Sequence, residues 1–74
     1  MDAMNQDEIP SPMVGDLYVD ENGEYFHIIG IVNNGHGIAC KDGSGAIYVS
    51  IDEIEMSQTI DYPGYMIWTI KGMV

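Results

Sequence analysis

Three turn dipeptides at short intervals constrain the fold of this chain more than any other feature of its sequence. Asn22-Gly23, Asn34-Gly35 and Asp42-Gly43 each lie between runs rich in β-branched and aromatic residues. Such dipeptides adopt the left-handed backbone of tight turns, so each one predicts a β-hairpin. The strands expected from these turns, with one more near the C-terminus, cover residues 16–20, 24–32, 37–41, 46–50 and 65–70. The sequence therefore predicts a mostly β fold, an antiparallel meander of four strands plus a fifth.

A short helical turn is expected before the last strand. Ser50 and Glu53 have the spacing of a capping box, in which the serine hydroxyl accepts a hydrogen bond from the backbone N–H three residues on. The turn should end near Met56. Pro63-Gly64 then has the order of residues that a type II turn requires.

The first hairpin predicts which side chains are buried. If Asn22-Gly23 forms a two-residue loop, Val19 lies opposite Phe26 in the facing strand. Because strand side chains alternate between the two faces of a sheet, this register separates a core face from a face in contact with water. The core face is expected to hold Leu17, Val19, Phe26 and Ile28, and the water face Tyr18, Asp20, Tyr25 and His27.

The hairpin closed by Asn34-Gly35 conflicts with this alternation. Its register places Ile31 opposite Ile38 and, in a regular strand, on the opposite face from Ile28. A regular strand cannot bury both sets of residues on one side. Gly30 lies where the pattern changes, so a β-bulge or a sharp bend is expected there. The conflict favours a curved barrel over a flat sheet.

The expected fold has five strands, of which one is long and bent, and a helical turn before the last strand. This arrangement resembles the SH3-like small barrels. The segment 14–20, Val-Gly-Asp-Leu-Tyr-Val-Asp, followed by Asn22-Gly23, is similar to the start of short proteins of bacteriophages and mobile elements. These resemblances imply a single five-stranded SH3-like barrel over residues 14–74. Residues 1–13 are acidic with little to bury, and are expected to form a flexible N-terminal arm.

The charge balance limits the class of partner. Twelve Asp and Glu residues stand against only Lys41 and Lys71, giving a net charge of −10 with no arginine. Nucleic-acid binders neutralise phosphates with clustered cations, so this composition argues against direct binding of DNA or RNA, and equally against anionic membranes. The expected partner is a basic protein surface, because opposite fields accelerate the encounter. A single cysteine and an acidic start predict a reducing compartment, the cytoplasm.

Residues capable of chemistry are few. Cys40, His27 and Asp42 come near a thiol-nucleophile arrangement, but a bulge in the preceding strand would break their alignment and nothing supplies an oxyanion hole. Two histidines and one cysteine fall short of a zinc site, and the calcium-like segment 20–23 has a tyrosine where the first ligand should stand. We expect no enzyme activity, no metal and no cofactor.

The sequence offers instead a surface of aromatic and acidic side chains. Aromatic residues anchor protein interfaces, while carboxylates meet the Lys and Arg side chains of a partner. The contact residues expected from the first hairpin are Asp16, Tyr18, Asp20, Glu21, Glu24, Tyr25 and His27. A second acidic group, on the helical turn, consists of Asp52, Glu53 and Glu55. The alternative is that the tyrosines are ordinary strand formers and the carboxylates only keep the protein soluble.

These features favour a phage-encoded inhibitor that occupies the basic nucleic-acid-binding surface of a host protein. The likeness to DNA mimics, such as anti-CRISPR and anti-restriction proteins, rests on size, acidity and a compact β fold. The alternative function is a structural or adaptor barrel that binds a partner protein through strand edges, with no inhibitory role.

The last expected strand carries apolar residues on both of its faces. Met66, Trp68 and Ile70 are expected to pack inward. Tyr65 and Ile67 would then be exposed and form a homodimer edge, or be covered by the N-terminal arm.

Overall fold

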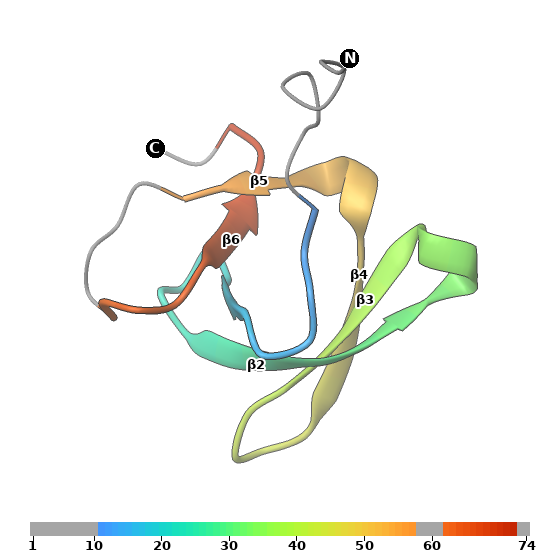
Figure 1. Cartoon of the computed structure of the whole chain (residues 1–74). Helices are drawn as coiled ribbons and strands as arrows, with labels where there is room; N and C mark the ends of the chain where they lie inside the picture. Colours follow the sequence, from blue (N-terminus) through green and yellow to red (C-terminus); the bar gives the residue numbers. More distant parts are fainter. Residues whose placement is uncertain (1–10, 58–61, 73–74) are drawn as a thin grey trace.

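A computed structural model describes residues 11–57 and 62–72, which form one curled sheet (Figure 1). The six strands of this described part are β1 (Leu17–Val19), β2 (Tyr25–Val32), β3 (Gly37–Lys41), β4 (Ala46–Ser50), β5 (Ile54–Met56) and β6 (Ile67–Ile70). Two three-residue 3-10 turns, η2 (Asn33–Gly35) and η3 (Ile51–Glu53), follow β2 and β4. The strand order across the sheet is β4-β3-β2-β1-β6-β5. The mostly β prediction is confirmed.

The predicted strands are present with shifted ends, and one further strand was missed. β3 and β4 match their predicted ranges residue for residue, whereas β2 begins one residue late and β6 two residues late. Ser50 caps a turn as expected, its hydroxyl accepting from the N–H of Asp52 at 3.3 Å. That turn, however, is η3 and ends at Glu53. The chain then extends into β5, so the helical turn expected to reach Met56 is wrong.

β1 and β6 run parallel, a pairing that an antiparallel meander does not contain. Leu17 pairs with Ile67 and Val19 with Thr69. β6 therefore lies between β1 and β5 as an interior strand. The homodimer edge expected on the last strand is wrong, because an interior strand has no free edge.

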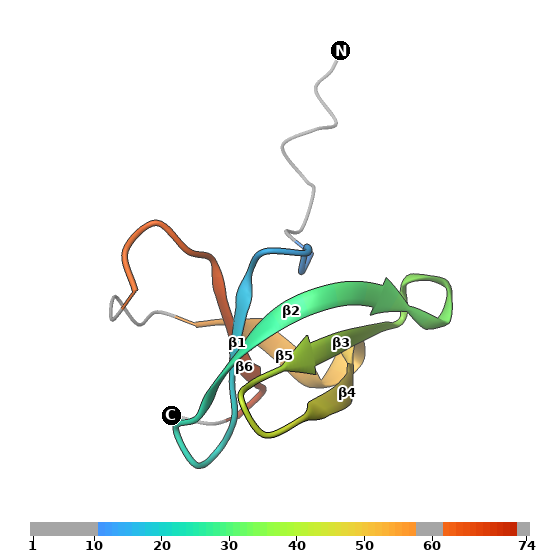
Figure 2. The same ribbon diagram turned by 90° about the horizontal axis from the view of Figure 1, so that it is seen from below.

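The two edges of the sheet are neighbours in the chain. β4 is one edge strand and β5 the other, yet only η3 separates them. Five inter-strand gaps of about 4.8 Å would hold the edges of a flat sheet about 24 Å apart. The link from Ser50 to Ile54 reaches no more than about 14 Å even when fully extended. The sheet therefore has to curl, and it forms the half-barrel seen in Figure 1 and, from below, in Figure 2.

The register of the first hairpin differs from the prediction by one residue. Tyr18 pairs with Phe26, because a three-residue loop, closed by Asp20 and Glu24, replaces the expected two-residue loop. The Asp20 carboxylate accepts from the backbone N–H groups of Asn22 at 2.9 Å and of Glu24 at 2.8 Å, which stabilises the longer loop. Tyr18 consequently lies on the inner face, only 3% exposed, and its predicted place on the water face is wrong.

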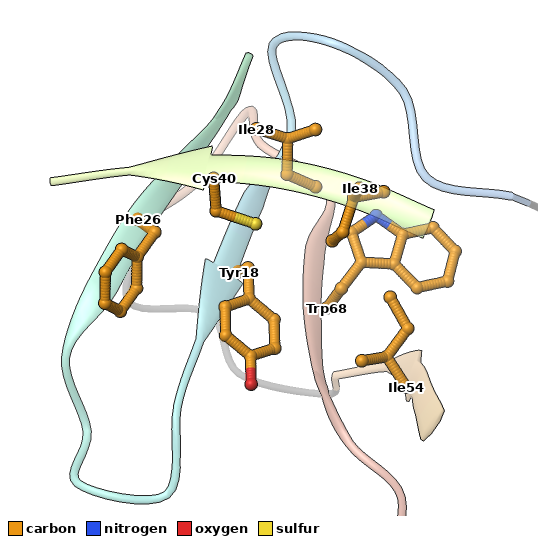
Figure 3. Packing of buried hydrophobic residues seen from close by; sticks show 7 residues of the cluster. All are labelled: Tyr18, Phe26, Ile28, Ile38, Cys40, Ile54 and Trp68. Carbon is orange, nitrogen blue, oxygen red and sulfur yellow. The ribbon is translucent and has the colours of Figure 1, made fainter. Parts of the chain in front are cut away.

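Both faces of β1 are buried, in two separate clusters. The inner cluster, shown in Figure 3, consists of Tyr18, Phe26, Ile28, Ile38, Cys40, Ile54 and Trp68. The outer cluster consists of Leu17, Val19 and Ile67, with Tyr25 packed against them. The predicted core face is thus divided between the two clusters. In the last strand Trp68 packs inward as expected, but Ile67 is buried instead of exposed and Met66 is 42% exposed instead of buried.

A bulge interrupts the pairing of β2 with β3 at the position that the sequence indicated. The register shifts between Ile28 and Gly30, which leaves Ile29 without an opposite residue. Beyond the shift Ile31 pairs with Ile38, as predicted. A bulge bends a strand and increases its twist, which is what the curl of this sheet requires.

The Asp16 carboxylate joins β6 to the start of β1. Its Oδ2 atom accepts from the Trp68 indole Nε1 at 3.0 Å and from the backbone N–H of Met13 at 2.9 Å. This predicted contact residue is therefore engaged inside the protein. Pro12 is buried, so packing begins before Val14, where the domain was expected to start. Residues 1–10 of the expected arm lie outside the described residues.

The bulge does not depend on the glycine at position 30. A Cβ at Gly30 would lie 3.9 Å from the Cβ of Ala39, an ordinary contact, whereas Gly23 has a φ of +82°. Gly30→Ala should therefore change the free energy of unfolding by less than about 1 kcal/mol. Gly23→Ala should lower it by about 1 to 2 kcal/mol, because its loop needs the left-handed conformation. Urea unfolding measures both, and equal losses in the two variants would contradict this expectation.

Removing the Asp16 carboxylate should destabilise the fold. Asp16→Ala deletes a charged acceptor and leaves the buried Trp68 N–H unpaired, so we expect a loss of about 1.5 to 3 kcal/mol. Glu21→Ala removes the same single negative charge, but from an exposed side chain, so it should lower the free energy of unfolding by less than about 0.5 kcal/mol. Trp68 is the only tryptophan of the chain, so its fluorescence reports urea unfolding directly. A loss in Asp16→Ala no larger than in Glu21→Ala would show that this hydrogen bond does not hold β6.

Candidate functional site

The charges of acidic side chains from two distant parts of the chain act on the Tyr18 hydroxyl. Burial raises the pKa of this hydroxyl most, followed by the charges of Asp20, Cys40, Glu21 and Glu53. Asp20 and Glu21 belong to the β1–β2 connection, whereas Glu53 lies on η3. In Figure 3 the Tyr18 hydroxyl points away from the Cys40 side chain.

Glu24 and Asp42 bring two carboxyl groups into direct contact. A hydrogen bond to Asp42, then its charge, raises the pKa of Glu24, with burial and the charge of Asp20 adding to the shift. The pKa of Asp42 is lowered, first by the backbone N–H of Ser44 at 2.7 Å and then by that of Gly45 at 3.1 Å. On acidification Glu24 therefore takes up a proton before Asp42 does. We call Asp20, Glu21, Glu24, Asp42 and Glu53 together the acidic rim.

A surface of aromatic side chains adjoins the acidic rim. The Tyr25 and Tyr62 rings meet edge to face, with centroids 4.6 Å apart and an angle of 68°. One hollow of about 330 Å³ is lined by Leu17, Tyr25, His27, Tyr62 and Tyr65. A second, of about 410 Å³, is lined by Tyr25, His27, Ile29, Lys41, Asp42 and Gly43. We call Tyr25, His27, Tyr62 and Tyr65 the aromatic face. Asp42 of the acidic rim lines the second hollow together with Tyr25 and His27, so the rim adjoins the aromatic face.

The sequence identified half of the aromatic face. His27 is exposed on the outer side of β2, as predicted, whereas Tyr25 is half-buried there and packs against Leu17 and Val19 instead of lying on a separate water face. Tyr18 lies in the core instead. Tyr62 and Tyr65 take its place, and the sequence carried a signal for them, since one aromatic residue stands on each side of Pro63-Gly64.

The second predicted acidic group is divided between two places. Glu53 belongs to the acidic rim, whereas Asp52 and Glu55 border a separate hollow of about 320 Å³. The remaining lining of that hollow is Ser11, Pro12, Ile51, Ile54, Met56, Trp68 and Lys71. Asp42, which the sequence analysis did not include among the contact residues, is the residue that joins the rim to the aromatic face.

The thiol arrangement considered from the sequence is not assembled. Cys40 lies in the inner core with no exposed surface, while His27, which pairs with Lys41, is exposed on the outer face. Burial raises the pKa of the Cys40 thiol to about 11, so the thiol is neutral near pH 7. Across residues 11–57 and 62–72, no three His, Cys, Asp or Glu side chains are grouped closely enough to ligate a metal ion.

Comparison of this chain with protein-family models, with curated proteins and with solved structures finds no match. Within the described residues, none of the helices is long and apolar enough to cross a bilayer. The function has to be inferred from the chemistry of the acidic rim and the aromatic face.

The buried Cys40 should be inert in the folded protein. At pH 8 we expect dithiobis(nitrobenzoate) to modify no thiol in water and one per chain in urea, because the reagent needs an accessible thiolate. The unfolded thiol titrates near pH 8.5 to 9, below the folded value, so its contribution to stability is full below that range and is lost as the pH rises towards 11. The urea midpoint of Cys40→Ala should therefore fall less between pH 8 and 10.5 than that of the parent. Rapid modification in water would show that the core opens.

Proposed function

We propose that this protein is a binding module for a basic protein surface, which it contacts with the acidic rim and the adjoining aromatic face. The contact between the Glu24 and Asp42 carboxyls carries this proposal. The hydrogen bond to Asp42 and the charge of Asp42 raise the pKa of Glu24, as expected for two carboxyl groups that repel each other when both are charged. A cation supplied by a partner relieves that repulsion, and the aromatic face beside it offers side chains of the kind that anchor interfaces.

We further propose that the partner uses the covered surface to bind nucleic acid. A site that binds phosphates is already lined with Lys and Arg, and clustered carboxylates satisfy the same cations. With a net charge of −10, the protein is also drawn to such a surface from a distance. The protein would then act as an inhibitor in the cytoplasm of a host cell, in the manner of phage-encoded DNA mimics of the anti-CRISPR or anti-restriction type.

The fold proposed for this module is a variant of the SH3-like barrel expected from the sequence. The consecutive strands β2, β3 and β4, and the turn η3 before the C-terminal strands, support that assignment. In this proposal β5 is an addition to the five strands.

A second candidate function is an adaptor that binds by strand addition. β4 is an edge strand whose five residues carry no charge, although charged residues commonly protect such edges. Its Tyr48 is 75% exposed. An extended partner segment, or a second copy of this chain, is able to pair with such an edge.

Charge reversal in the rim tests the first proposal. Asp20 is left unchanged because it closes the first hairpin, and Glu21, Glu24 and Glu53 are replaced by Lys. We expect the parent, used as bait at low salt in a bacterial lysate, to retain nucleic-acid-binding proteins that added salt or DNA releases. The variant should lose them without unfolding, because a lysine at position 24 pairs with Asp42.

The matched control carries the same change of charge in residues 1–10. Replacing Asp2, Asp7 and Glu8 by Lys also adds six charges, so −10 becomes −4 in both variants. Retention by the control and loss by the rim variant would place binding on the rim. Binding that survives rim reversal and high salt but is lost in Tyr48→Lys would overturn the proposal in favour of strand addition.

A further inference from the structure

The hollow bounded by the aromatic face has walls of aromatic rings and an apolar floor. Tyr25, Tyr62, Tyr65 and His27 surround about 330 Å³, and the buried Leu17 closes the bottom. The Tyr25 and Tyr62 rings stand at 68° to each other, so together they form a corner.

Two of these tyrosines keep much of their surface exposed. Tyr62 and Tyr65 are 45% and 50% exposed, while Leu17, which lines the hollow with them, is buried. The rings therefore keep free surface around an open space. Aromatic faces carry negative electrostatic potential, and they attract a cation held within about 6 Å of the ring centre.

The charges around the hollow favour a cation over a neutral apolar group. Asp42 of the acidic rim lines the adjoining hollow, which shares Tyr25 and His27 with this one. Lys41 also lines the adjoining hollow but not this one. No lysine or arginine of the described chain lines the hollow of the aromatic face.

We propose that this hollow binds the guanidinium group of an arginine side chain presented by the basic partner. The inference rests on the proposed function and names the subsite at which the partner is anchored. Guanidinium is planar and weakly hydrated, so it stacks on tyrosine rings at a lower desolvation cost than the ammonium of lysine. The rim attracts the basic partner, and the hollow receives one of its arginines.

The test uses a minimal probe, acetyl-Gly-Arg-Gly-amide, against the same peptide with the neutral isostere citrulline. Titration of the full chain at physiological salt is followed by NMR of its side chains and backbone. We expect the arginine peptide to shift the signals of Tyr25, Tyr62 and Tyr65, and to bind about three- to fivefold more tightly than the citrulline peptide. Equal binding of both peptides, or no binding of either, would overturn the cation site.

Variants separate the hollow from the acidic rim. Tyr62→Leu and Tyr65→Leu should each weaken the arginine peptide about three- to fivefold. Tyr48→Leu, which removes a more exposed tyrosine on β4, is the matched control and should leave binding unchanged. If the arginine peptide shifts only residues of the rim, the hollow is not the arginine site while the proposed function survives. If the hollow binds arginine but rim reversal leaves partner capture intact, the function fails and the site stands.

Discussion

The shape of this protein follows from one constraint: the two edge strands of a six-stranded sheet are joined by three residues. η3 links β4 to β5, and no flat sheet brings its edges within that reach. The bulge between Ile28 and Gly30 bends β2, which gives the sheet the curvature it needs. The curl encloses the inner cluster, and the bond from Trp68 to Asp16 fixes the last strand beside the first.

The same curl explains why the candidate site lies where it does. η3 carries Glu53, so closing the half-barrel lets the charge of this carboxylate act on Tyr18, as the charges of Asp20 and Glu21 do from the β1–β2 connection. The β1–β2 and β3–β4 connections meet through Glu24 and Asp42. On the outer side, Tyr25 packs against Leu17, Val19 and Ile67 and also lines the hollow. This tyrosine therefore belongs both to the packing of the fold and to the candidate site.

Local chemistry was readable from the sequence, and long-range pairing was not. The turn dipeptides predicted both ends of β3 and of β4. The apolar residues on opposite faces of the second strand predicted the bulge. The first register failed because the Asp20 carboxylate binds two backbone N–H groups and thereby admits a third loop residue. That single residue moved Tyr18 from the expected interface into the core. Tyr62 and Tyr65 were missed because they reach Tyr25 only through the parallel pairing of β1 with β6, which no local pattern encodes.

The parallel pairing of β1 with β6 also has a consequence for the order of events during folding. Leu17 pairs with Ile67, which is far from it in the sequence, whereas β2, β3 and β4 pair with strands that follow one another in the chain. Contacts that close long loops form late, because the chain loses the entropy of loop closure before the contact stabilises the fold. The aromatic face combines residues of β2 with Tyr62 and Tyr65, which precede β6 in the chain. It is thus among the last features to be completed.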